Sequence, residues 1–215
     1  MTNLATYFDQ LLFVALPYVA FFVFFLVSIT RYHWRGFTYS SLSSQFLENR
    51  QHFWGLVPFH YGIIVVLTGH VVAWLIPRQV LWWNDRPLRL YILEISALAC
   101  GLLTLIGLVS LMLRRLTVSK IRVVTSKLDW VVLLLLLAQV VSGVGTAVLY
   151  PWGSSWYAAM AAPYLWSILK LNPDLTYIAA MPPLVKFHIV GAFALILVFP
   201  FSRLVHILVI PNPYL

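Results

Sequence analysis

Five apolar stretches, each close to the length of a membrane-spanning helix, constrain this chain more than any other feature of its sequence. They cover residues 11–30, 54–76, 90–113, 130–150 and 187–210. A helix needs about 20 mostly apolar residues to cross a bilayer, and only helices and closed barrels satisfy their own backbone hydrogen bonds in lipid. The sequence therefore predicts an all-α membrane protein, a five-transmembrane-helix bundle forming one domain over residues 1–215. A further apolar stretch, 156–171, is shorter and contains Pro163, so we expect an interfacial or loop-packed helix there.

The composition excludes the soluble classes of protein. Hydrophobic residues make up 62% of the 215 residues and charged residues only 9%, whereas soluble domains carry about 25% charged residues. The polar segments are too short for a soluble domain, so chemistry in the water phase would belong to partner subunits. The single cysteine, Cys100, excludes a disulfide or a thiolate-ligated metal cluster within the chain.

Lysine and arginine are divided unequally between the two sides of the predicted bundle. One side has nine: Arg31, Arg35, Arg50, Arg114, Arg115, Lys120, Arg122, Lys127 and Arg203. The other side has five: Arg78, Arg86, Arg89, Lys170 and Lys186. Because basic loops tend to stay in the cytoplasm, we expect the N-terminus outside and the C-terminus inside the cell. These positions beside the spans also account for the net charge of +8 through contact with lipid headgroups, and we expect no nucleic-acid partner.

Four histidines lie inside the apolar stretches. His60 and His70 are in the second stretch, and His188 and His206 are in the fifth. An ionisable residue at membrane depth is costly and indicates a functional site. The two stretches run antiparallel, so depth pairs His60 with His206 and His70 with His188. Two imidazoles make a six-coordinate haem suited to electron transfer, and the pattern predicts two haems between helices two and five.

The spacing of the histidines leaves alternatives open. His60 and His70 are ten residues apart, a rise of about 15 Å, whereas His188 and His206 are eighteen apart, about 27 Å. A tilt of the helices or a bend at Pro200 would absorb the difference. On spacing alone His52, eighteen residues before His70, competes with His60. Interhelical hydrogen bonds are the alternative role for such histidines. Small residues near them would admit a flat macrocycle: Gly62, Gly69 and Gly191.

Several segments resemble the gamma subunit of respiratory nitrate reductase, a five-span dihaem cytochrome b. They are FHYGIIVVLTGH at 59–70, KFHIVG at 186–191, FPFSRLVH at 199–206 and SSQFLENR at 43–50. The similarity covers nearly the whole chain and is weakest at 151–183. It implies His60 and His206 as ligands of a cytoplasmic-side haem, His70 and His188 as ligands of an outer-side haem, and it decides against His52. It also implies a quinol site beside the outer haem, formed by Gly69, His70 and a basic residue.

That basic residue is a lysine in the family and aligns best with Arg89 here, although Arg86 is an alternative. The resemblance further implies two haem b groups, a location in a prokaryotic cell membrane, and a role in nitrate respiration. Quinol would be oxidised at the outer side. Electrons would reach an iron–sulfur subunit and then a molybdenum-containing catalytic subunit that binds nitrate.

Three further charged residues are candidates for roles beside the haems. Arg115 and Arg203 lie where a guanidinium would bind a haem propionate, and Glu94 is a candidate proton acceptor. Two other functions fit the same residues. One is a cytochrome b anchor of an oxidoreductase with a different terminal substrate, and the other is a proton transporter with a histidine relay.

Overall fold

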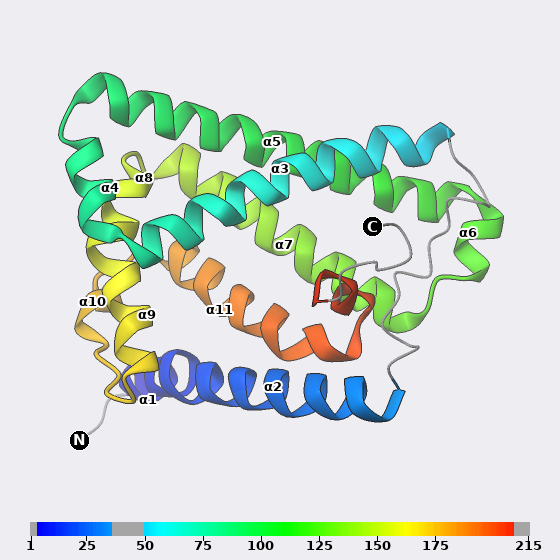
Figure 1. Cartoon of the computed structure of the whole chain (residues 1–215), viewed down its shortest axis with the longest axis horizontal. Coiled ribbons are helices and arrows are strands. Elements are labelled where there is room, and N and C mark those ends of the chain that lie inside the picture. The colour runs from blue at the N-terminus through cyan, green and yellow to red at the C-terminus, as the bar shows by residue number, and fades with distance from the viewer. Residues whose placement is uncertain (1–3, 36–49, 209–215) are drawn as a thin grey trace.

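Five long apolar helices form the body of the molecule, as the sequence predicts. The computed structural model describes the backbone of residues 4–35 and 50–208 and the side chains of 7–34 and 54–208. The helices long and apolar enough to cross a membrane are Tyr7–Trp34, Trp54–Leu75, Pro87–Thr117, Lys127–Leu149 and Pro183–Phe201. Figure 1 shows them running roughly side by side, joined by shorter helices at the two ends. The described residues contain no strand.

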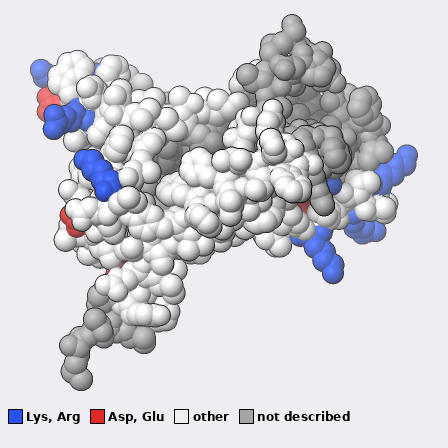
Figure 2. Space-filling model, turned by 60° about the horizontal axis from the view of Figure 1, so that its bottom comes forward, with Lys and Arg blue, Asp and Glu red and all other residues white. Residues whose placement is uncertain are grey.

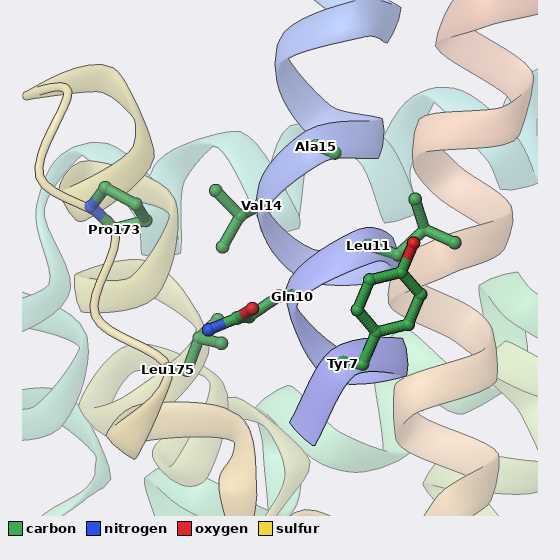
Figure 3. A pocket seen from close by; sticks show the side chains of 7 residues that line it. All are labelled: Tyr7, Gln10, Leu11, Val14, Ala15, Pro173 and Leu175. Atoms are coloured by element: carbon green, nitrogen blue, oxygen red, sulfur yellow. The ribbon is translucent and has the colours of Figure 1, made fainter. Parts of the chain in front are cut away.

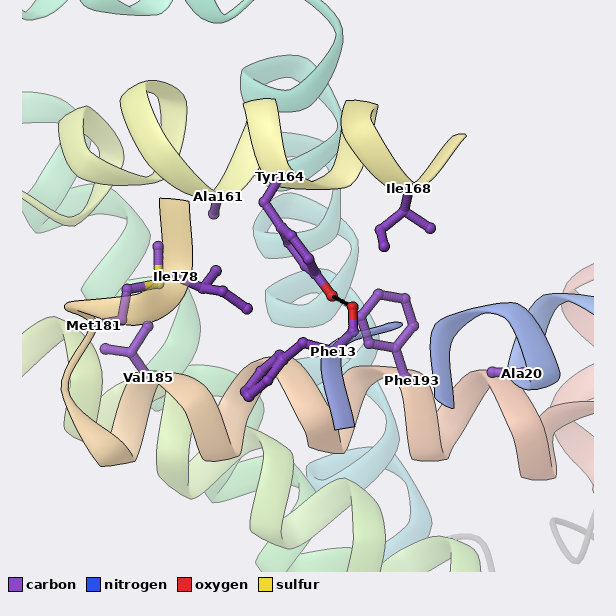
Figure 4. Close-up of a cluster of buried hydrophobic side chains, with 9 residues drawn as sticks. All are labelled: Phe13, Ala20, Ala161, Tyr164, Ile168, Ile178, Met181, Val185 and Phe193. Carbon is purple, nitrogen blue, oxygen red and sulfur yellow. Dashed lines mark hydrogen bonds between the residues drawn. The ribbon is translucent and has the colours of Figure 1, made fainter. Parts of the chain in front are cut away.

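The first span is assembled from three segments: α1 (Leu4–Gln10), a π-helical turn η1 (Leu11–Ala15) and α2 (Leu16–Arg35). Pro17 lies just after the π turn and has no N–H to donate to the carbonyl of Phe13. The hydroxyl of Tyr164 donates to that carbonyl instead, at 2.7 Å. The freed backbone group thus becomes one of the points where the first span is joined to the loop helices (Figure 4).

The second and third spans pack closely along their lengths because glycines line their contact. They are α3 (Arg50–Leu75) and α5 (Pro87–Thr117). A Cβ on Gly107 would meet the backbone N of Phe59, and one on Gly62 would lie 2.6 Å from the carbonyl O of Cys100. Small residues that let backbones approach are typical of helix contacts in membranes. Gly62 therefore serves the α3–α5 contact, and its predicted role beside a macrocycle is wrong.

The fifth span, α11 (Pro183–Val198), packs between α2 and α7 (Lys127–Leu149). Phe21 and Phe193 meet edge to face, with ring centroids 5.9 Å apart. An ion pair between Lys186 and Asp9, 3.6 Å long, joins the start of α11 to the first span. The buried core lies at this end, between the first span, α11 and the loop helices. It contains Phe13, Ala20, Ala161, Tyr164, Ile168, Ile178, Met181, Val185 and Phe193 (Figure 4).

Short helices connect the spans at both ends. At one end, called here the α4 end, lie α4 (Pro77–Asn84), α8 (Gly153–Trp156), the π turn η3 (Tyr157–Ala161), α9 (Ala162–Leu169) and α10 (Thr176–Ala179). At the other, the α6 end, lies α6 (Ser119–Val123). The stretch around Pro163 is thus broken into short segments and forms no sixth span among the described residues. It is tied to α3 by Trp166, whose indole stacks on Trp74 and donates to the Trp74 carbonyl at 2.9 Å.

The fifth span ends before the predicted residue 210, because the chain turns at Pro200 and Ser202. A 3₁₀ turn, η4 (Phe199–Phe201), is followed by Ser202 in an extended conformation and by a second 3₁₀ segment, η5 (Arg203–Leu208). Arg31 of the first span donates to the carbonyls of Pro200 and Ser202, at 2.6 and 3.1 Å. The stretch from His188 to His206 is therefore not one straight helix. The predicted bend at Pro200 is present, and the pairing of His206 with His60 stays a prediction.

The α6 end is held by charged and capping contacts. Ser126 and Asp129 form a reciprocal capping box at the start of α7, with bonds of 3.1 and 2.8 Å. Asp129 also pairs with Arg203 at 3.1 Å, which fixes η5 against α7. Figure 2 shows lysines and arginines gathered towards the two ends of the visible face, with an uncharged middle between them.

Candidate metal centre

Three of the four histidines are oriented by their own backbone. The Nδ1 atoms of His60, His70 and His206 lie 2.9, 2.8 and 2.6 Å from the carbonyl oxygens of Leu56, Val66 and Arg203. A carbonyl only accepts, so Nδ1 carries the proton in each case. Each Nε2 then has a lone pair available for a metal. A backbone carbonyl in this role is the usual partner of a metal-ligating histidine.

His188 is oriented from a neighbouring helix. Its Nδ1 lies 3.0 Å from the hydroxyl of Ser142, and its Nε2 lies 3.3 Å from the side-chain amide N of Gln139. Both partners belong to α7, one turn apart, inside an otherwise apolar span. The sequence analysis missed both residues. Polar side chains in an apolar stretch were the available signal, since such residues usually face the bundle interior.

The structure brings the imidazole rings of His70, on α3, and His188, on α11, close together. Their ring centroids lie 6.4 Å apart, with the planes inclined at 44°. Two imidazoles on opposite sides of one metal ion, each bonded at about 2 Å, have centroids about 6 Å apart. The helices carrying them do not pack extensively against each other within the described ranges. This arrangement suits a planar group held between the two rings.

Tyr157 forms a wall of this site at the α4 end. Its hydroxyl lies 3.3 Å from the carbonyl O of His70, and its ring meets the imidazole edge to face at 5.2 Å. Burial raises the pKa of Tyr157 to about 12, so the phenol stays protonated and donates at neutral pH. Tyr157 begins the π turn η3, a geometry frequent at functional sites. It lies in the loop where the family resemblance is weakest, and sequence reasoning did not find it.

Comparison with known proteins identifies the family. The sequence profile of the nitrate reductase gamma subunit matches residues 9–215. The chain belongs to the nitrate reductase gamma subunit family. It is 34% identical to the nitrate reductase gamma chain of Bacillus subtilis (strain 168), over 96% of this chain and 94% of that protein. It is 30% identical to the respiratory nitrate reductase 2 gamma chain of Escherichia coli (strain K12), over 92% and 89%.

A longer relative matches over the same region. The nitrate reductase-like protein NarX of Mycobacterium tuberculosis (strain ATCC 25618 / H37Rv) is 29% identical over 96% of this chain, which spans 32% of that protein. The gamma subunit family is a membrane cytochrome b component of nitrate reductase. The donor set described above fits haem iron, because imidazole nitrogens with anchored Nδ1 protons are haem ligands in many cytochromes.

His60 and His206, the second predicted pair, make no hydrogen bond or ring contact with each other among the described contacts. His60 lies within α3, with its ring edge-on to Phe59 at 5.3 Å. His206 lies in η5, after the turn at Ser202, and not in the long helix. The rival His52 falls within α3 but among the residues whose side chains are not described. His33 is exposed at the end of the first span.

The residues predicted for a quinol site lie at the α4 end. Gly69 and His70 are exposed, and a Cβ on Gly69 would meet nothing within 4 Å. Arg89 lies over the rings of Trp82 and Trp83, with centroid distances of 4.9 and 5.4 Å. The helix that carries these tryptophans, α4, packs against η3, the segment that contains Tyr157. Arg86 is exposed at the start of α5.

The other predicted polar residues make contacts within the protein. Arg115 donates to the hydroxyl of Thr125 at 3.0 Å, and Arg203 donates to the carbonyl of Val124 at 3.2 Å. Their role toward haem propionates stays a prediction. Glu94 accepts from the backbone N and the hydroxyl of Ser154, at 2.8 and 2.5 Å, which ties α5 to α8.

Gly191, predicted to lie beside a macrocycle, lies against Gln139. The cavity beside the first span lies away from the four histidines. A Cβ on Gly191 would meet the amide oxygen of Gln139, so Gly191 makes room for that side chain and not for a macrocycle. An open cavity of about 520 Å³ lies beside the first span and contains none of the four histidines. Its lining, drawn in Figure 3, is Tyr7, Gln10, Leu11, Val14, Ala15, Pro173 and Leu175.

Proposed function

We propose that this chain is the quinol-oxidising dihaem cytochrome b subunit of a respiratory nitrate reductase in a prokaryotic cell membrane. The observation that carries the proposal is the close approach of His70 and His188, with ring centroids 6.4 Å apart and a hydrogen-bond partner at each Nδ1. His70 from α3 and His188 from α11 would hold one haem b near the α4 end. His60 and His206 would hold the other nearer the α6 end. Bound haem supplies reversible one-electron chemistry.

The α4 end is the side on which quinol would bind. Gly69 leaves the backbone beside His70 open, and Tyr157 closes one wall of that region. Arg89, held over two indole rings, offers a fixed positive charge that would stabilise an anionic oxygen on the quinol. Arg86, at the start of the same helix, is the alternative.

The α6 end would face the cytoplasm and the partner subunits. Most of the predicted cytoplasmic lysines and arginines fall in α6, at the end of α5 and at the start of α7. An iron–sulfur subunit docked there would receive the electrons and pass them to a molybdenum-containing subunit that reduces nitrate. Electrons delivered to one side while protons leave on the other conserve about 2.3 kcal/mol per charge per 100 mV.

Reduced-minus-oxidised absorption spectra of the purified complex test the proposal. We expect two b-type components that titrate separately. Replacing His70 or His188 with Ala should remove the same component, and replacing His60 or His206 should remove the other. The matched control is His33→Ala, which changes an exposed histidine outside both pairs and should leave both components. A complex with no b-type absorption would overturn the proposal.

The role of Arg89 has a separate measurement. Arg89→Ala should slow the oxidation of a soluble quinol analogue while both b-type components remain in the spectrum. Arg86→Ala is the control, because its side chain is exposed and makes no described contact with the tryptophans. An unchanged quinol turnover in Arg89→Ala, with a loss in Arg86→Ala, would move the role to Arg86.

A further inference from the structure

Two polar side chains of α7, Ser142 and Gln139, contact the ring of His188. Among the four candidate ligands, His188 is the one whose Nδ1 is not bonded to a carbonyl of its own segment. Ser142 is 2% exposed, so it does not face lipid. Its hydroxyl and the amide of Gln139 contact the two different nitrogens of the His188 ring. His60, His70 and His206 instead use carbonyls of nearby residues on their own segments. His188 is thus the candidate ligand whose orientation a side-chain substitution can change.

The direction of each hydrogen bond follows from the donors available. Ser142 has one hydroxyl proton, and it donates that proton to the backbone carbonyl of Gln139 at 3.0 Å. Toward His188 its oxygen can therefore only accept, so Nδ1 of His188 carries the proton. The Nε2 atom then has a lone pair, which accepts from the amide N–H of Gln139 at 3.3 Å.

The surroundings of Gln139 agree with this tautomer. The amide oxygen is buried without a hydrogen-bond partner among the described residues, and it lies against Gly191. The amide nitrogen is the half of the side chain that faces Nε2. Gln139 therefore donates to the ring nitrogen that a metal would bind, and iron bound at Nε2 would replace this hydrogen bond.

We propose that Ser142 is a positioning residue that holds the proton of His188 on Nδ1 and so presents Nε2 to haem iron. The inference rests on the proposed role of His188 as a haem ligand. A hydrogen bond accepted from Nδ1–H makes the imidazole a stronger electron donor to the metal. Ser142 therefore lowers the reduction potential of the haem that His188 binds.

Redox titration and low-temperature electron paramagnetic resonance of the assembled complex test the inference. In Ser142→Ala we expect the potential of the His70–His188 haem to rise and its low-spin signal to shift, while the other haem keeps its wild-type values. Ser142→Thr keeps the hydroxyl and should restore both readouts. The matched control is Thr146→Val, which removes another buried hydroxyl one turn further along α7. It should change neither potential.

The outcomes separate this inference from the proposed function. An unchanged potential and an unchanged signal in Ser142→Ala, with both haems present, would overturn the role of Ser142. If Ser142→Ala loses that haem, its recovery in Ser142→Thr supports the role and its loss there overturns it. Both haems present in His188→Ala would overturn the proposed function, and this inference with it.

Discussion

The Tyr164 hydroxyl illustrates at the residue scale how one missing N–H shapes this protein. Pro17 cannot donate to the carbonyl of Phe13, and the phenol of Tyr164 takes that place. The side chains of Phe13 and Tyr164 are almost fully buried, and their rings meet edge to face with centroids 6.4 Å apart. A single tyrosine thus links the first span to the loop helices by a hydrogen bond and by ring packing.

Tyr164→Phe should lower the free energy of unfolding by about 1–3 kcal/mol, because it leaves a buried carbonyl without a partner. Thermal unfolding in detergent, followed by tryptophan fluorescence, measures the change. Pro17→Ala restores an N–H next to that carbonyl, so the double variant should lose less than the sum of the two single variants. Strict additivity would mean that the two residues are not coupled.

Leu171 is a second residue whose backbone conformation is unfavourable for its side chain. Its φ is 58°, in the left-handed region, where it ends α9. The N–H groups of Leu171 and Asn172 bond to the carbonyls of Ile168 and Ser167, the pattern of a Schellman motif. Glycine is the usual residue at this position because it has no Cβ.

Leu171→Gly should raise the free energy of unfolding by about 1 kcal/mol, because the left-handed conformation costs a non-glycine residue about 1–2 kcal/mol. The side chain is 77% exposed, so little packing is lost. Leu169→Gly is the control, since Leu169 is exposed and helical and its replacement should have the opposite sign. Thermal unfolding followed by tryptophan fluorescence measures whether each variant raises or lowers the free energy of unfolding.

At the scale of elements, the α3–α5 contact decides where the candidate ligands His60 and His70 stand. Glycines bring the two helices close enough for backbone to meet backbone, as at Gly107 and Phe59. This contact fixes the position of the helix that carries both histidines. The sequence did not show this pairing, because a glycine beside a histidine suits a helix contact and a cofactor contact equally.

Gly107→Ala should lower the free energy of unfolding by about 1–3 kcal/mol, because the new methyl meets backbone atoms that cannot rotate away. The matched control is Gly101→Ala on the same helix, where a Cβ would lie 3.4 Å from Val144 Cγ2. It should be tolerated. Equal melting temperatures for the two variants would contradict the close packing at Gly107.

The chain as a whole shows which features a sequence can predict. Five spans and an interrupted segment around Pro163 follow from length and hydropathy, and the structure confirms both. His70 and His188, paired by depth in the sequence, have ring centroids 6.4 Å apart, and their role as ligands of one haem stays a prediction. Ser142 and Gln139 were not predictable in the same way, because their contact with His188 depends on how α7 is rotated about its axis. Periodicity does not give that angle when nearly every position is apolar.

The orientation of the whole molecule has its own test. In a Cys100→Ala background, Asn172→Cys at the α4 end should react with a membrane-impermeant maleimide added to intact cells. Ser119→Cys at the α6 end should react only after the membrane is opened. Both residues are exposed, so access is decided by the side of the membrane. Labelling of Ser119→Cys in intact cells would reverse the proposed orientation.

The bonds from Arg31 to the carbonyls of Pro200 and Ser202 have a consequence for biogenesis. Arg31 is synthesised 169 and 171 residues before the two carbonyls that it binds. A second contact, the ion pair between Arg203 and Asp129, joins η5 to an earlier span, α7. These contacts can therefore form only after the fifth span and the turn that follows it have been synthesised, so this part of the α6 end is completed after the first four spans exist.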